Sequence, residues 1–226
     1  MADPINIFIA YSHKDENYLN ELRAQLRILE RQGIVHIWHD GKIIAGQKWD
    51  AVIEDQLAKS DIFLMLLSAD FINSDYAYGK EMTQALKRHE RGEATIIPII
   101  ARDCAWELTP LAELQAPVQG KALSSVNAEQ RQTLYKGIVL AIHQAVKQRQ
   151  AEIKNQNRYF ADEKAWDNAL QLHSINAYHR YLKQHSQGGH AEEARQAIAA
   201  IKRTQEKEKQ SIEQKAWQAA QRANTV

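Results

Sequence analysis

The sequence feature that most constrains the fold is a run of six apolar residues with no polar interruption, Ile62–Leu67. A strand with one face in water alternates apolar and polar residues, so a continuous run indicates a strand buried on both faces. Strands of this kind occur in parallel sheets that helices cover on both sides. The run therefore predicts an α/β domain with this strand near the middle of the sheet.

Four other segments have the composition of strands. They cover residues 5–11, 34–38 and 95–100, with a weaker candidate at 121–124. Because proline cannot donate a ladder hydrogen bond, Pro98 indicates that the strand at 95–100 lies near an edge of the sheet. Strands that alternate with helices five times predict a doubly wound parallel sheet.

Helical periodicity separates these strands. In the first interval, leucines recur every three to four positions on one face of an amphipathic helix that Gly33 ends. Further helices are expected at about 49–59, 74–90 and 129–148. Right-handed crossovers then place the loops after the first three strands at one edge of the sheet.

The helix after the buried strand carries the candidate catalytic residue, Glu81. We expect Ser74 to be its N-cap, which puts Glu81 in the second turn, just past the carboxyl end of the strand. Ligands of open parallel sheets bind at that edge. The alternative is that Glu81 is an ordinary solvent-exposed helix glutamate.

The composition limits the classes of partner. Lys and Arg number 29 against 28 Asp and Glu, a formal charge of +1, so no nucleic acid or membrane partner is expected. A single cysteine, Cys104, excludes an internal disulfide framework and is typical of a reducing compartment. With no long apolar segment and no charged leader, we expect a cytoplasmic protein. The histidines lack metal-ligand spacing, so no metal is expected.

From residue 150 the chain becomes rich in alanine, glutamine, lysine and glutamate. The segment at 165–169 recurs at 216–220, so that Trp166 and Trp217 lie 51 residues apart. Helical repeats of such a period usually stack in arrays. We therefore assign one domain to 1–149 and a helical repeat-like extension to 150–226, and expect the chain to be truncated inside its second repeat. Chance similarity between alanine-rich helices is the alternative.

Three segments occur in an informative order: Phe8–Asp15, Asp40–Gly46 and Ser74–Glu81. Together they resemble the Toll/interleukin-1 receptor (TIR) domain family in its bacterial branch, over about residues 4–148. The resemblance implies a flavodoxin-like five-stranded parallel sheet, here followed by an all-α extension. For many bacterial and plant members it also implies cleavage of NAD⁺ between nicotinamide and ribose.

The resemblance assigns the catalytic role to Glu81. Family members often carry an aromatic residue four positions earlier to stack against the substrate, and here that position is Ala77. Tyr76 and Tyr78 flank it, and either could take over the stacking if the helix starts at a shifted position.

Five further residues match the family's site by position. Tyr11 and Ser12 correspond to a wall of the site, with capping of the first strand as the alternative. Asp40, Lys42 and Trp49 lie in or beside the loop that gates the pocket in the family and mediates assembly. For Trp49, a place in the hydrophobic core is an equally good interpretation.

The function that the resemblance implies is that of an NAD⁺ nucleosidase, or NAD⁺ glycohydrolase, which releases nicotinamide and linear or cyclic ADP-ribose. NAD⁺ is then the substrate, and no cofactor is expected. Implied partners are other TIR domains, in a dimer or filament, and a protein or ligand trigger that acts through the C-terminal helices in bacterial immunity. The alternative is a non-catalytic adaptor that acts by TIR–TIR association through the loop at 40–49.

Overall fold

The computed structural model describes residues 3–42, 49–74, 79 and 82–223. The chain forms two compact units, one up to Glu152 and one from Ile153. No helix within the described ranges is long and apolar enough to cross a lipid bilayer.

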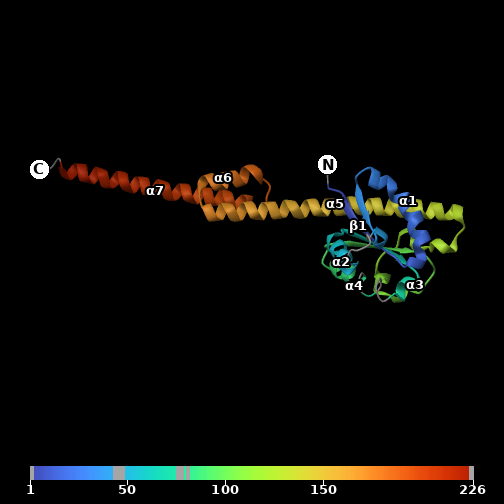
Figure 1. Ribbon diagram of the computed structural model, residues 1–226. Helices are drawn as coiled ribbons and strands as arrows, with labels where there is room; N and C mark the ends of the chain where they lie inside the picture. The colour runs from blue at the N-terminus through green and yellow to red at the C-terminus, as the bar shows by residue number, and fades with distance from the viewer. Residues whose placement is uncertain (1–2, 43–48, 75–78, 80–81, 224–226) are drawn as a thin grey trace. The chain divides into compact units, whose positions relative to one another are not determined.

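A parallel sheet of four strands forms the centre of the first unit (Figure 1). The strands are β1 (Ile5–Ala10), β2 (Val35–Trp38), β3 (Ile62–Leu67) and β4 (Thr95–Ile100). They lie in the order β2-β1-β3-β4, and each neighbouring pair is parallel. All six residues of β3 are buried, which confirms the interpretation of the apolar run.

Helices cover both faces of the sheet (Figure 1). The helices are α1 (Glu16–Arg31), α2 (Trp49–Lys59), α3 (Ala69–Ile72), α4 (Met82–Glu90) and α5 (Ala128–Leu172), of which α5 continues into the second unit. The periodic leucines of α1 are all buried, as their spacing predicts. Tyr135 of α5 is fully buried and donates a hydrogen bond of 3.2 Å to the Tyr18 carbonyl of α1.

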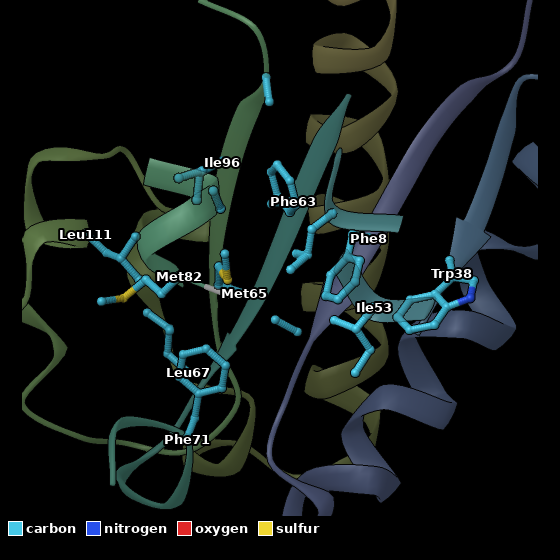
Figure 2. Close-up of a cluster of buried hydrophobic side chains, with 14 of the residues drawn as sticks. Phe8, Trp38, Ile53, Phe63, Met65, Leu67, Phe71, Met82, Ile96 and Leu111 are labelled. Carbon is cyan, nitrogen blue, oxygen red and sulfur yellow. The ribbon is translucent and has the colours of Figure 1, made fainter. Parts of the chain in front are cut away.

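One hydrophobic core lies between the sheet and the helices α2 and α4. Alternate residues of a strand share a face, and here Phe8, Phe63 and Ile96 project to the same side (Figure 2). The ring of Phe8 lies 5.0 Å from that of Trp38 and 5.9 Å from that of Phe63, measured between centroids. Ile53 and Leu57 from α2 and Met82 and Ala85 from α4 complete the cluster. This packing holds the carboxyl ends of the strands in a constant arrangement.

The fifth strand predicted at 121–124 is wrong. The segment instead enters a 3₁₀ turn at Leu123–Ser125, and the Ser124 N–H donates a hydrogen bond of 3.0 Å to the Ala101 carbonyl. The preceding 3₁₀ turns start at Pro110 and Pro117, so the backbone has no extended run long enough to form a ladder. Among the described residues, β4 is therefore an edge strand.

Pro98 fits this edge position, as its sequence context predicts. The Thr95 N–H donates to the Asp61 carbonyl and the Ala101 N–H to the Leu67 carbonyl. The backbone N–H groups of odd-numbered residues in β4 therefore point toward β3. Pro98 is even-numbered, and its nitrogen points away from β3. No ladder hydrogen bond is lost, because the missing donor belongs to the open edge.

Two helices differ from the sequence-based prediction. The segment 68–73, to which the sequence analysis assigns no helix, contains the short helix α3, because the Ser68 side chain accepts a hydrogen bond from the Phe71 N–H and caps it. The beginning of the helix expected at 74–90 falls on residues 75–81, of which only Gly79 is described, so its start at Ser74 stays a prediction, and α4 is described from Met82. The closing helix α5 extends beyond 148 to Leu172, because no proline or second glycine interrupts it after Gly137.

The second unit consists of the end of α5, α6 (Ile175–Gln184) and α7 (Ala191–Ala223). Trp166 of α5 packs against Tyr178 and Tyr181 of α6, with ring centroids 5.8 and 5.4 Å apart. Ala194 and Ile198 from the first part of α7 close the cluster. A small hydrophobic core thus holds the three helical segments together.

A close contact explains the glycine inside α5. A Cβ atom on Gly137 would lie 2.6 Å from Cγ1 of Val118, which itself has a left-handed backbone with φ of 49°.

We predict that Gly137→Ala lowers the free energy of unfolding by about 1 kcal/mol. Alanine favours a helix over glycine by about 1 kcal/mol, but the overpacking against Val118 costs more than this gain. In a Val118→Ala background the same change should stabilise. Urea denaturation of the four variants measures this reversal, and a stabilising effect in both backgrounds would refute the contact.

Candidate functional site

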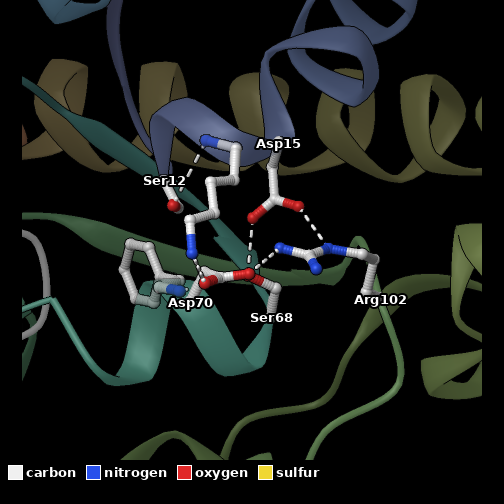
Figure 3. A network of polar contacts seen from close by, with 7 residues as sticks. Ser12, Asp15, Ser68, Asp70 and Arg102 are labelled. Carbon is white, nitrogen blue, oxygen red and sulfur yellow. Dashed lines mark hydrogen bonds and ion pairs between the residues drawn. The ribbon is translucent and has the colours of Figure 1, made fainter.

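A network of charged side chains lies at the carboxyl ends of β1, β3 and β4 (Figure 3). Asp15 ends a 3₁₀ turn after β1, Ser68 and Asp70 follow β3, and Arg102 follows β4. Parallel strands bring these loops to one edge, because all their carboxyl ends point the same way. Residues far apart in the sequence thus meet at the edge where the ligands of such sheets bind.

Asp15 is the centre of this network. Its side chain is fully buried, and a buried carboxylate needs partners for its charge. Oδ1 accepts a hydrogen bond of 2.6 Å from Nε of Arg102, and Oδ2 accepts one of 2.5 Å from the Ser68 hydroxyl. The Ser68 oxygen in turn accepts from the Phe71 N–H at 3.1 Å. One carboxylate therefore joins the loop after β1 to α3 and to the loop after β4.

Asp70 forms the outer part of the network. It lies 2.5 Å from Nη2 of Arg102 and 2.6 Å from Nζ of Lys14. The hydrogen bond from Lys14, and then that from Arg102, lowers the pKa of the Asp70 carboxyl. The stabilising effect of Asp70 is present above the ordinary pKa of about 3.8 and is lost as the pH falls through the lowered value.

A second group of polar side chains lies at the ends of β1 and β2. Nε2 of His13 is 3.2 Å from Oδ2 of Asp40, and the ring of Tyr11 lies 5.6 Å from that of His13. Burial, and then the charge of Asp40 and a hydrogen bond to it, raises the pKa of the Tyr11 hydroxyl. Tyr11 and Asp40 therefore belong to one group, which combines a hydroxyl that can donate with a carboxylate that can accept.

Gly41 allows the chain to turn tightly beside this group. A Cβ atom at Gly41 would lie 2.9 Å from Cε1 of His39, whose side chain is buried. Any larger residue would therefore displace the imidazole or the loop. The glycine lets the backbone after β2 approach the His39 ring, next to Asp40.

The structure brings only some of the sequence-predicted residues together. Tyr11 and Asp40 both lie near His13, and the Ser12 side chain caps the 3₁₀ turn after β1 by accepting from the Lys14 N–H at 3.4 Å. Ser12 thus caps the turn that follows the first strand, and a contact with substrate stays a prediction.

The other predicted residues lie partly or wholly outside the described part. Lys42 ends the 3₁₀ turn that begins at Asp40, and Trp49 begins α2. The side chains of both residues lie outside the described part of the structure. Glu81, Tyr76 and Tyr78 also lie outside the described residues.

Sequence reasoning missed four residues of the charged network: Asp15, Ser68, Asp70 and Arg102. Each follows the end of a predicted strand within a few positions, and this is the signal that could have identified them. Which of these side chains pair could not be predicted from the sequence, because contacts between loops 53 to 87 residues apart depend on the order of the strands in the sheet.

One of the comparisons with known proteins identifies a family. The sequence model of the TIR domain family matches residues 7–135. An uncharacterised protein of Sinorhizobium fredii, y4lF, is 46% identical over 120 residues, which are 53% of this chain and 37% of that protein. The chain thus spans little more than a third of that relative's length. A crystal structure of a conserved Enterococcus faecalis protein matches 65% of this chain and 99% of its own at 15% identity, with a TM-score of 0.33.

The buried charge of Asp15 leads to a prediction about stability. Arg102→Ala removes the cation and leaves the carboxylate buried without it, which should cost about 3 kcal/mol of unfolding free energy. Lys14→Ala breaks only an exposed pair with Asp70 and should cost much less. Urea denaturation at neutral pH measures both variants. Equal effects of the two would show that Asp15 does not need Arg102.

Proposed function

Because this chain belongs to the TIR domain family, we propose that it cleaves NAD⁺ at the bond between nicotinamide and ribose. The family includes NAD-cleaving enzymes as well as adaptors. The observation that carries the proposal is the family match over residues 7–135, a range that includes Tyr11, Asp40 and Glu81.

Glu81 is the carboxylate proposed for catalysis. It directly precedes Met82, the first residue of α4, and the chain reaches it from the carboxyl end of β3 through α3. When the glycosidic bond breaks, its electron pair moves to the pyridinium nitrogen, and nicotinamide leaves as a neutral molecule. Positive charge then develops on the ribose, and an ionised carboxylate next to it stabilises that charge. Water attacks the anomeric carbon and loses a proton, which gives ADP-ribose.

The pair of Tyr11 and Asp40 suits recognition of the sugar. Asp40 accepts hydrogen bonds, Tyr11 donates them, and ribose hydroxyl groups can do both. The Tyr11 hydroxyl is protonated at neutral pH and can donate, and its raised pKa extends this state to a more alkaline pH. Lys42, Trp49, Tyr76 and Tyr78 complete the proposed binding surface, with the aromatic rings available for stacking on nicotinamide or adenine.

The charged network around Asp15 supports the proposed site indirectly. It joins α3 to the loops after β1 and β4, and α3 leads into the segment that carries Glu81. A catalytic group must be held in one geometry to lower a barrier, and such a framework reduces the freedom of the neighbouring chain. Arg102 is thus a positioning residue in this proposal.

TIR domains generally self-associate, and we include assembly in the proposal. The loop at 40–49 would gate the site and contact a neighbouring TIR domain, while the helical extension would receive a trigger. The biological context we propose is a cytoplasmic effector of bacterial immunity that depletes NAD⁺ or produces a linear or cyclic ADP-ribose messenger.

The proposal predicts the effect of removing the carboxylate. Glu81→Gln keeps the size of the side chain and removes its charge, so nicotinamide release from NAD⁺ should fall at least about 100-fold. Purified protein at high concentration is incubated with NAD⁺, and chromatography separates nicotinamide, linear ADP-ribose and cyclic ADP-ribose. Glu90→Ala, at the exposed far end of α4, is the matched control and should retain activity.

A second pair of variants separates catalysis from assembly. An adaptor would show no nicotinamide release from concentrated wild type, and its self-association would depend on Ile44 in the loop and not on Glu81. Sedimentation of Ile44→Asp and Glu81→Gln measures this difference. Nicotinamide release that survives in Glu81→Gln would refute the catalytic role of this residue.

A further inference from the structure

In the second unit, one face of α5 is covered by a helical hairpin. Asp162, Trp166 and Ala169 are each less than a tenth exposed on this face. The hairpin consists of α6 and the first part of α7, joined by the turn at 185–190 (Figure 1). Trp166 stacks on the ring of His190 in that turn, with centroids 4.9 Å apart and planes at 3°. The tryptophan is the apolar anchor of the face.

Asp162 is the polar anchor of the same face. Its Oδ1 accepts a hydrogen bond of 2.8 Å from the Tyr181 hydroxyl of α6, and its Oδ2 accepts one of 2.7 Å from the Gly189 N–H. Nδ1 of His185 lies 3.1 Å from Oδ1. These hydrogen bonds lower the pKa of the Asp162 carboxyl against the effect of its burial. A carboxylate on α5 thus fixes both ends of the hairpin turn.

The later part of α7 repeats these anchors. At the 51-residue offset that relates Trp166 to Trp217, Glu213 replaces Asp162, while Ala216 and Ala220 replace Ala165 and Ala169. In α7, however, every described residue from Lys202 to Arg222 is exposed, and Trp217 is 61% exposed. The residues that are buried on this face of α5 therefore have solvent-exposed equivalents in α7.

We propose that this face of α7, defined by Glu213, Ala216, Trp217 and Ala220, is a docking surface for a helical hairpin of the same kind as Ser174–Ile201. The occupant presents a tyrosine hydroxyl and a glycine-turn N–H to Glu213, as Tyr181 and Gly189 do to Asp162. Its apolar side covers Trp217. The docked hairpin is the next unit of a stacked array, because repeats of this type bury their faces only against neighbours.

The agreement of several residues supports this occupant over a nonspecific one. A carboxylate, two alanines and a tryptophan keep the relative positions that their equivalents have in α5, while Lys207, Glu208 and Lys215 lie on the opposite side of α7. On the docking face itself, Lys209 lies 4.0 Å from the Glu213 carboxylate, and both side chains are exposed. Interleaved charge of both signs does not favour nucleic acid. A second copy of this chain is a weaker candidate, because its own hairpin already covers its Trp166.

The sequence also continues the match into the start of a hairpin. Ser174 caps α6 by accepting from the Ala177 N–H at 3.2 Å, and Thr225, which can cap in the same way, stands at the equivalent position. Val226 stands where Ile175 begins α6. A copy of the hairpin can therefore be attached in register by adding the sequence of residues 176–203 directly after Val226.

The test compares the full chain with and without this added hairpin. Hydrogen exchange of the backbone amides at 204–223 should slow at least about tenfold when the hairpin is present, because docking protects the helix. With 5-fluorotryptophan in the protein, the ¹⁹F resonance assigned through Trp217→Phe should lose its solvent isotope shift. Exchange in the first unit and at 162–201 should stay unchanged, which shows that the rest of the chain is folded.

Two matched variants make the result specific. Trp217→Ala and Glu213→Ala should each remove the protection in the extended chain, whereas Lys215→Ala, on the charged side of the helix, should leave it intact. An exposed Trp217 in the extended chain would overturn the proposal. Self-association of the unextended chain that Trp217→Ala abolishes would also overturn it, by identifying a second copy as the occupant.

Discussion

The buried carboxylate of Asp15 is the constraint on which the arrangement of the strand ends depends. A charge without access to water must be compensated by nearby partners, and here the partners come from loops that follow two other strands. The ion pair with Arg102 and the hydrogen bond from Ser68 therefore connect three loops that lie far apart in the sequence. The segment that leads to Glu81 starts from α3, which Ser68 caps. Stability and the proposed chemistry thus depend on the same few contacts.

The helical unit uses the same physical principle in another setting. Asp162 is a largely buried carboxylate whose oxygens accept from a tyrosine hydroxyl and from a backbone N–H. In both units an acidic side chain joins elements that apolar packing alone would leave free to slide. Apolar contacts are not directional, whereas a buried hydrogen-bonded carboxylate permits one geometry. This explains why the exposed copy of that face, around Glu213 and Trp217, is informative about its partner.

Much of the α/β architecture was readable from periodicity. The apolar run at 62–67, the leucines of α1 and the edge position of Pro98 depend on local sequence and on burial, and each was predicted in place. The prediction of a fifth strand was wrong, because the chain before it forms 3₁₀ turns that start at prolines 110 and 117, and the hydrophobic pattern does not indicate these turns. Likewise, α3 arises from one capping hydroxyl, and α5 is longer than expected because its composition offers no stop signal.

The sequence by itself determined where the four strands and the helices between them form, the family, and the residue types available at each strand end. Those properties follow from local patterns of apolar and polar side chains. Only the tertiary structure decided that Asp15 pairs with Arg102, that Tyr11 and Asp40 both lie near His13, and that Trp166 is covered while Trp217 is not. The reason is that pairing across the sheet and burial of a helix face depend on strand order and on chain crossings, which bring together residues whose separation in sequence carries no signal.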